Sequence, residues 1–342
     1  MEAMNNEQME QQTISVCKNA ENSFSRLGFM FLIGTIVIYA VQYLTAWAVK
    51  SWKPEWLEDP SISLMVTILP MYLVGIPVLV YLVKKIPGTA PAQHDMKKSH
   101  LVLAFIMCYA VMYGSNLIGT VITTIIGLIK GSAVNNAVLD IATSANMGVT
   151  FIYMVICAPL IEEYVFRKLI VDRTARFGQG VAVVVSGVMF GLFHGNLSQF
   201  VYATTLGMFF TFIYVKTGKL RYSITLHMII NFIGAIVSVL VLKGIHLEEY
   251  MQIAATGDVE ALMAFVMKYL SGWITYLVYL LFVMATFVTG LILLIVFRKR
   301  FVLEPGEVVI PKGKKFATIF LNFGMLVYTL FWIGMMIVQL FM

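Results

Sequence analysis

The sequence predicts an all-α protein, a polytopic transmembrane helical bundle of about eight or nine spans. Of its 342 residues, 60% are hydrophobic and only 12% are charged, whereas about 25% charged residues is typical of soluble domains. The mean hydropathy is +0.86. Long hydrophobic runs also recur along the whole chain. Together these observations exclude a soluble globular protein.

Nine hydrophobic runs are long enough, or nearly so, to cross a hydrocarbon core of about 30 Å. The fifth and sixth are the shortest. In order, the runs lie near residues 29–49, 64–83, 101–129, 147–171, 179–194, 198–215, 221–244, 273–297 and 316–341.

Residues 1–28 precede the first run and are expected to form a cytoplasmic segment. They contain four Glu and lack the basic start and apolar core of a secretory signal peptide. Residues 29–342 then form a single membrane domain. Within it, the spacing of apolar residues over 259–270 predicts a short helix on the outer surface.

The distribution of Lys and Arg predicts the topology. With nine spans and the N-terminus inside, the great majority of the 24 basic residues fall in cytoplasmic segments. The net charge of +6 is then explained by topology and by anionic headgroups, without a nucleic-acid partner. We expect an integral protein of a bacterial plasma membrane whose N-terminus is cytoplasmic.

Two adjacent glutamates, Glu162 and Glu163, interrupt the fourth hydrophobic run, while all other acidic residues fall in polar ends or loops. A carboxylate at the bilayer centre costs about 2.5–3.5 kcal/mol even on insertion scales, so the pair indicates a functional site. Glu163 and Arg167 are four residues apart and share a helix face. Glu162 points about 100° away and is free to react. Pro159 removes a backbone hydrogen bond and is expected to bend the helix there.

Two further hydrophobic runs carry the in-span histidines. His194 ends a run in which Gly187 and Gly191 permit close helix approach. His227 and Asn231 are four residues apart and project to one side of the seventh run. Carboxylates, imidazoles and an amide inside one bundle are the groups needed to activate water and to stabilise an oxyanion.

Three motifs occur in order: Glu-Glu-x-x-x-Arg at 162–167, Phe-x-x-x-His at 190–194 and His-x-x-x-Asn at 227–231. This series resembles the CPBP family, which comprises the CAAX proteases (type II CAAX prenyl endopeptidase-like) and bacteriocin-processing intramembrane glutamic endopeptidases. The resemblance covers about 147–235, which would be the catalytic core.

The resemblance implies peptide hydrolysis inside the membrane by an activated water, without a covalent intermediate. Glu162 would be the general base, and His194 would help to orient and deprotonate the water. His227 and Asn231 would donate hydrogen bonds to the oxyanion, each worth roughly 3–4 kcal/mol when well aimed. The expected partners are a peptide or membrane-protein substrate and the lipid bilayer.

Under the same resemblance, Glu163 and Arg167 would brace the helix. One difficulty concerns depth. With about 1.5 Å of rise per residue, Glu162 lies roughly 16 Å from the cytoplasmic end, His227 roughly 9 Å and His194 roughly 21 Å. A tilted or short fifth helix, or a re-entrant piece between 179 and 215, would reconcile these depths.

Two alternatives stay open. A zinc-dependent membrane protease could use His194, His227 and Glu162, although no His-Glu-x-x-His motif is present and the glutamic mechanism needs no cofactor. A non-catalytic immunity or scaffold protein of the same family could keep the pocket without cleaving a substrate. The sequence sets neither the substrate nor the oligomeric state.

Overall fold

The computed structural model describes residues 2–134 and 137–341, and within these residues the chain forms helices and no strand. Labels with η mark 3-10 or π-helical segments. The elements are α1 (Glu2–Trp52), η1 (Pro54–Leu57), α2 (Pro60–Pro70), η2 (Met71–Gly75), α3 (Ile76–Lys84), α4 (Lys98–Lys130), α5 (Ala137–Ser144), α6 (Met147–Thr150), η3 (Phe151–Cys157), α7 (Ala158–Glu162), η4 (Glu163–Val171), α8 (Asp172–Thr174), η5 (Ala175–Phe177), α9 (Gln179–Phe193), α10 (Leu197–Thr217), α11 (Leu220–Phe232), η6 (Ile233–Val237), α12 (Ser238–Gly244), α13 (Leu247–Thr256), α14 (Val259–Lys268), α15 (Leu270–Val296), η7 (Arg298–Arg300), η8 (Lys312–Lys314), α16 (Lys315–Phe320) and α17 (Phe323–Phe341).

The all-α bundle predicted from the sequence is confirmed. In the described part of the chain, eight helical runs are long and apolar enough to cross a membrane, and the fifth predicted run is shorter, at 15 residues. The sixth, expected to be short, has 21 residues. The eight long runs are Glu10–Trp52, Pro60–Lys84, Lys98–Lys130, Met147–Phe177, Leu197–Thr217, Leu220–Gly244, Leu270–Val296 and Phe323–Phe341.

Some boundaries differ from the expected ones. α1 continues without a break through residue 28, and Ala20, Phe24 and Leu27 lie in the core. The last predicted run is divided into α16 and α17, because Asn322 begins a new helix by accepting a hydrogen bond from Met325 N. The helix expected over 259–270 is present as α14, and α13 precedes it.

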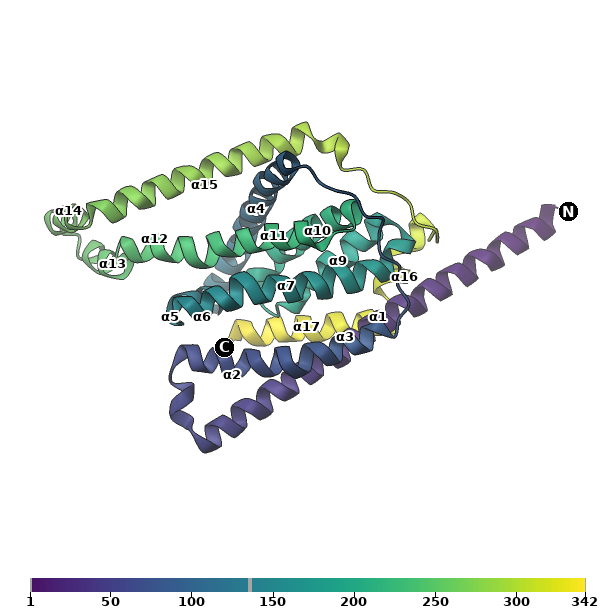
Figure 1. Ribbon diagram of the computed structural model, residues 1–342, viewed down its shortest axis with the longest axis horizontal. Helices are drawn as coiled ribbons and strands as arrows, with labels where there is room; N and C mark the ends of the chain where they lie inside the picture. Colours follow the sequence, from purple (N-terminus) through teal and green to yellow (C-terminus); the bar gives the residue numbers. More distant parts are fainter. Residues whose placement is uncertain (1, 135–136, 342) are drawn as a thin grey trace.

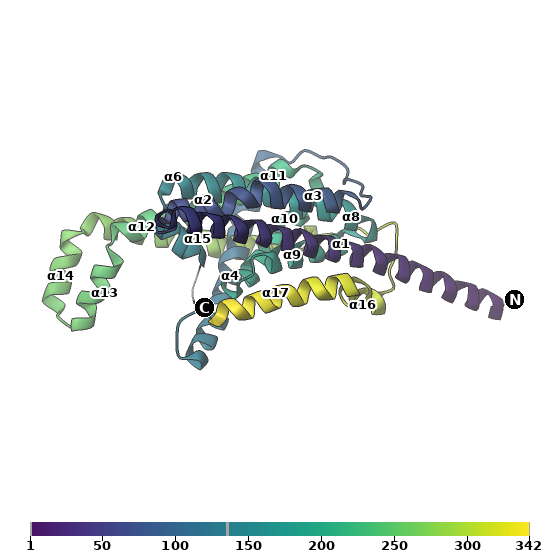
Figure 2. The same ribbon diagram turned by 90° about the horizontal axis from the view of Figure 1, so that it is seen from below.

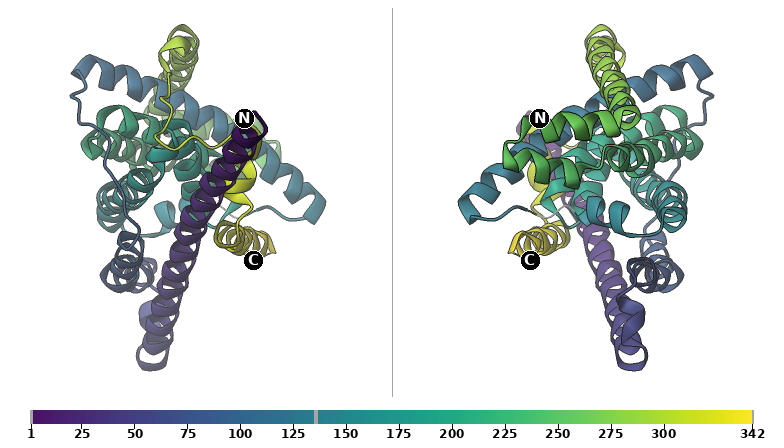
Figure 3. Two further views of the ribbon diagram at one scale, coloured as in Figure 1. Left: turned by 90° about the vertical axis from the view of Figure 1, so that its right-hand side faces the viewer. Right: turned by 90° about the vertical axis from the view of Figure 1, so that its left-hand side faces the viewer.

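Most long helices run side by side along one axis, and α4 crosses the bundle obliquely (Figures 1 and 3). The first turns of α1 project from one end, while α13 and α14 project from the other (Figure 1). At the first end, the basic segment 298–315 returns across the bundle and is held there. Gln179 N donates to Glu304 O at 3.0 Å, and Lys216 Nζ donates to Glu304 Oε1 at 2.7 Å. This lysine holds the pKa of Glu304 below its ordinary value.

Two buried clusters fill the bundle on either side of the paired helices α9 and α10. One includes residues of α1, α3, η4, α9 and α17, and the other includes residues of α4, α10, α11 and α15. Small residues bring α9 and α10 close together. A Cβ on Gly191 would lie 1.9 Å from Thr204 Oγ1, and one on Gly187 would lie 2.9 Å from Met208 N. Close van der Waals packing of this kind stabilises helix pairs in lipid, where the hydrophobic effect between helices is absent.

Candidate active site

Glu162 and His194 lie on a helical hairpin whose two arms meet at Gly178. The helical run Met147–Phe177 leads into the turn, and α9 leads out of it. Gly178 has a φ of 114°, a backbone conformation that favours glycine. Glu162 and His194 are each sixteen residues from this turn, about 24 Å along each arm, so they reach the same level of the bundle. Phe166 and Phe190, each twelve residues from the turn, pack with ring centroids 5.1 Å apart.

π-helical backbone surrounds the acidic pair. η3 precedes α7 and η4 follows it, so the helix is widened on both sides of Glu162. Pro159 lies at the start of α7 and has no N–H to donate to the preceding turn. The backbone on both sides of α7 therefore departs from a regular α-helix, and π-helical segments are frequent at functional sites.

Glu163 and Arg167 form a fully buried ion pair. Arg167 Nε lies 3.1 Å from Glu163 Oε2, and both side chains are 0% exposed. The guanidinium also lies over two aromatic faces, 4.4 Å from the centroid of Phe190 and 5.3 Å from that of Phe210. The predicted pairing is confirmed, and the charge of Glu163 is balanced inside the protein.

Glu162 faces a cavity instead. Its side chain is 27% exposed, and Oε2 lies 3.7 Å from His227 Nε2. No Lys or Arg of the described residues forms an ion pair with it. Glu163 is therefore the carboxylate with a cationic partner and Glu162 the one without, as expected from their spacing to Arg167.

His227 lies between the two carboxylates. Its Nδ1 is 3.0 Å from Glu163 Oε1, and its ring stacks on Phe210 with a centroid distance of 5.2 Å. Because a carboxylate only accepts, the Nδ1 proton points to Glu163 and Nε2 turns toward Glu162. Glu163 therefore does more than brace its own helix, since it also orients an imidazole that is 64 residues away in sequence.

His194 caps the end of α9. Its Nδ1 donates to Phe190 O at 2.8 Å, because a carbonyl oxygen can only accept. In the neutral ring the proton is therefore on Nδ1, and Nε2 is an acceptor. Phe190 also packs edge-on against the ring at 4.8 Å. Both in-span imidazoles are thus held by Nδ1 and leave Nε2 available.

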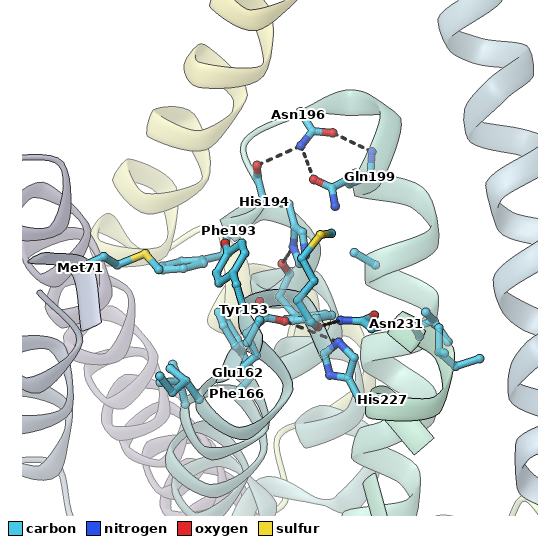
Figure 4. A pocket seen from close by; sticks show the side chains of 18 of the residues that line it. Met71, Tyr153, Glu162, Phe166, Phe193, His194, Asn196, Gln199, His227 and Asn231 are labelled. Carbon is cyan, nitrogen blue, oxygen red and sulfur yellow. Dashed lines mark hydrogen bonds and ion pairs between the residues drawn. The ribbon is translucent and has the colours of Figure 1, made fainter. Parts of the chain in front are cut away.

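Asn231 lies one helical turn beyond His227 and lines the same cavity. Its Nδ2 donates to Met154 O at 2.7 Å, so one amide proton is occupied by η3 and a second remains. The expectation that His227 and Asn231 project to one side of their helix is confirmed (Figure 4).

The cavity that joins these groups has a volume of about 340 Å³. Figure 4 shows Glu162, His194, His227 and Asn231 around it, with Tyr153 close to the carboxylate. Its walls come from η2, α3, α5 and the elements between α6 and α11. The lining residues are Met71, Tyr72, Ile76, Ile141, Tyr153, Met154, Ala158, Ile161, Glu162, Val165, Phe166, Phe190, Phe193, His194, Asn196, Gln199, Tyr202, Ala203, Leu206, His227, Ile230 and Asn231.

Two features of the fold correct the unequal depths that the sequence predicted for Glu162, His194 and His227. The helix that carries Glu162 continues to Phe177, so Glu162 is as far from its turn as His194 is. The loop 85–97 packs over the turn that precedes α11, since a Cβ on Gly218 would lie only 2.5 Å from Ala92 O. His227 is therefore deeper than its position in α11 suggests.

Three pocket residues were missed by the sequence argument. Asn196 caps α10 by accepting a hydrogen bond from Gln199 N at 2.8 Å, and its Nδ2 donates to His194 O at 3.2 Å. Gln199 Nε2 in turn donates to Tyr202 Oη at 2.9 Å. Asn followed by Gln three residues later is a capping-box pattern that could have been recognised.

Among the described residues, no group of three or more His, Cys, Asp or Glu side chains is placed to hold a metal ion. Glu163, the carboxylate nearest to His227, already binds Nδ1 of that ring and the guanidinium of Arg167.

The polar core of the bundle coincides with a match to known proteins. Residues 144–233, which contain Glu162, His194, His227 and Asn231, match the family "Type II CAAX prenyl endopeptidase Rce1-like". The resemblance to CAAX proteases is confirmed. This match, together with the eight apolar helices, supports an integral membrane protein that is similar to CAAX proteases over residues 144–233.

Two bacterial relatives are similar to this CAAX protease-like chain. YdiL of Bacillus subtilis, a candidate membrane peptidase, is 26% identical over 127 residues, which cover 36% of this chain and 50% of YdiL. The membrane-embedded CAAX protease MroQ of Staphylococcus aureus is 26% identical over 212 residues, which cover 58% of this chain and 84% of MroQ. The chain thus spans half the length of YdiL and most of MroQ. No solved structure gives a significant match.

Proposed function

We propose that this protein is an intramembrane endopeptidase that hydrolyses a peptide bond with a water activated by Glu162. The observation that carries the proposal is the 3.7 Å approach of Glu162 Oε2 to His227 Nε2 within a cavity that His194 and Asn231 also line. The match to the CAAX prenyl endopeptidases supports the reaction class.

Glu162 is the general base. Its carboxylate lines the cavity, and no Lys or Arg of the described residues forms an ion pair with it. Its oxygens are therefore available to accept a proton. Glu163 is unsuited to this role because both of its oxygens are engaged, one by Arg167 and the other by His227. A base must lie within hydrogen-bonding reach of the proton it abstracts, and only Glu162 of the pair meets a cavity that admits water.

His194 assists the proton transfer. With its Nδ1 bound to Phe190 O, Nε2 of His194 can accept a hydrogen bond from the attacking water. The water oxygen adds to the carbonyl carbon, and its proton passes to Glu162. When the C–N bond breaks, that proton goes to the leaving amine, so the products are a free amine and a carboxylic acid.

The oxyanion requires donors that face the same cavity. The second Nδ2 proton of Asn231 is available, because the first is held by Met154 O. A protonated Nε2 of His227 is the other donor, as expected from the family resemblance. Removing a single oxyanion donor lowers kcat by about 10²–10³-fold in other hydrolases.

The substrate is a peptide or a segment of a membrane protein, presented within a bacterial plasma membrane. A peptide inside the bilayer must have its backbone polar groups satisfied. Asn196, Gln199 and Tyr202 form a polar row beside His194 that can supply such partners. The mechanism uses no cofactor, and zinc bound by His194, His227 and Glu162 is the alternative that a chelator tests.

The proposal is tested by comparing cells that carry the native protein with cells that carry Glu162→Gln, using proteomics that reads peptide termini. Cleaved termini should be present with the native protein and absent with the variant. Glu307→Gln is the matched control, because Glu307 is an exposed acid outside the cavity. Identical termini with native and Glu162→Gln proteins would contradict the proposal and favour a non-catalytic scaffold.

A further inference from the structure

The C-terminal helix α17 lies outside the matched segment 144–233, yet it packs against α1 and α9 (Figure 2). Its inward face carries two large aromatic residues, Tyr328 at 0% exposure and Trp332 at 2%. Both contact the last two turns of α9, where His194 is held.

Tyr328 binds the backbone of α9 directly. Its hydroxyl donates to Met189 O at 3.0 Å, five residues before His194. The same ring packs edge-on against Phe31 of α1 at 6.1 Å, which fixes its direction. A phenol aimed at one main-chain carbonyl sets the position of α9 relative to α17.

Trp332 supports both neighbours of His194. Its ring centroid lies 5.2 Å from that of Phe193. On the other side, a Cβ on Gly195 would lie only 2.9 Å from the indole, and Gly195 has a φ of 63°. The indole therefore lies directly against the turn that carries the catalytic imidazole, and only glycine fits between them.

α9 needs such support because it ends inside the bundle. Its 15 residues reach about 22 Å from Gly178, so its last turn cannot be anchored at the far surface. His194 is bound through Nδ1 to Phe190 O, a carbonyl of that same turn. Any movement of the turn therefore moves Nε2 by a similar distance.

α17 has an anchor that is independent of this contact. A Cβ on Gly28 of α1 would lie 2.6 Å from the carbonyl of Gly324, and Gly324 N donates to Ser25 Oγ at 3.0 Å. The start of α17 is thus fixed on α1 whether or not Trp332 is present. Changes at Trp332 should act mainly on the end of α9.

We propose that Trp332, together with Tyr328, is a positioning residue for His194, and that α17 completes the active site from outside the family segment. This inference rests on the proposed function, because it assigns His194 a role in turnover. Trp332 itself touches no reacting atom in this scheme. It acts by holding the turn His194–Asn196 at the level of Glu162.

The test uses Trp332→Leu, Trp332→Phe and the control Leu330→Ala, which removes a side chain on the exposed face of the same helix. Cleavage of a membrane-anchored peptide is measured in nanodiscs as kcat and KM. Misplacing a catalytic group by about 1 Å costs about 10²-fold, so Trp332→Leu should lower kcat by that order with KM nearly unchanged. Trp332→Phe should recover most of the loss, and Leu330→Ala should match the native protein.

Coupling to His194 separates positioning from general stability. In a His194→Gln background, measured by single turnover, adding Trp332→Leu should cause no further loss of rate. A full additional loss, or a native kcat for Trp332→Leu, would overturn the inference. If Trp332→Leu does not fold, Tyr328→Phe removes only the hydroxyl and should lower kcat by about three- to tenfold; a native kcat for that variant likewise overturns it.

Failure of the proposed function would look different. In that case Glu162→Gln and His194→Gln would both cleave at the native rate, whatever Trp332→Leu does. If those two variants lose activity while Trp332→Leu keeps it, the proposed function stands and only the positioning role fails.

Discussion

Substitutions of the adjacent acids Glu162 and Glu163 should have different effects: one should lower activity and the other should lower stability. Glu163→Gln removes the negative charge from a pair in which both side chains are 0% exposed, and it leaves Arg167 charged and buried. Glu162→Gln removes a charge that faces a cavity and has no cationic partner. Although the two changes are chemically identical, their surroundings predict opposite outcomes.

The expected magnitudes follow from burial. Removing one partner of a buried ion pair costs about 3–5 kcal/mol, which is roughly 150- to 5,000-fold in the unfolding equilibrium constant. Glu163→Gln should therefore unfold much more readily than the native protein. Glu162→Gln should change the free energy of unfolding by less than about 0.5 kcal/mol but lower kcat by about 10²–10⁴-fold, as expected for loss of a general base.

Unfolding is measured by titration with SDS in mixed micelles, read by tryptophan fluorescence, and turnover is measured on the same preparations. The double variant Glu163→Gln/Arg167→Met is the control. It removes both charges and should recover stability, because an apolar replacement of a buried pair is often neutral or stabilising. It should not recover activity, since Nδ1 of His227 no longer faces a negatively charged carboxylate.

Equal stability of Glu163→Gln and the native protein would refute the reasoning, because it would mean that Arg167 has another partner. A large loss of stability in Glu162→Gln would refute it as well. In that case Glu162 would be a structural residue, and the division of roles between the two acids would be wrong.

Three further predictions address packing, pH and metal. Gly191→Val should destabilise the α9–α10 contact by about 1–3 kcal/mol, seen as lower folded yield, because its Cβ would lie 1.9 Å from Thr204 Oγ1. Lys216 lowers the pKa of Glu304 below 4.5, so this carboxylate stabilises the fold above that pH and the effect is lost as the pH falls through the folded value. Glu304→Gln should therefore be less stable than the native protein near pH 7 in thermal melts, and the two should converge as the pH falls below the folded-state pKa of Glu304. A strong chelator should leave cleavage unchanged, whereas a loss that added zinc restores would favour the zinc protease.

Hydrophobicity alone was enough to predict the fold class and most spans, because a long apolar run in this chain can only be a spanning helix. It failed at the end of the fourth span, which was expected at residue 171 but continues to Phe177. The polar residues there read as a loop, yet they are bound within the bundle. Asp172 accepts from Tyr214 Oη at 2.9 Å, and Arg173 Nε donates to Val83 O at 2.9 Å.

The motifs were enough to predict which side chains share the site, but not all of their partners. The pairing of Glu163 with Arg167 follows from four-residue spacing, a local rule. The bond from His227 to Glu163 joins residues 64 apart in sequence, and no local rule predicts it. The packing of α17 against α9 could not be predicted either. In the sequence, Trp332 lies in a continuous apolar run, and nothing there distinguishes a buried tryptophan from one that faces lipid.

The short helix α9 explains how an imidazole, that of His194, can lie inside a bundle of apolar helices. Irregular backbone is tolerated within the bilayer only where its polar groups are satisfied by protein or lie against a water-filled cavity. Here the turn after α9 is satisfied by its own residues, since Asn196 donates to His194 O and the imidazole donates to Phe190 O. The bonds that satisfy the polar groups of this turn are therefore the same bonds that hold the imidazole of His194 at the cavity. It follows that the turn could not be replaced by regular helix without also removing the imidazole from the site.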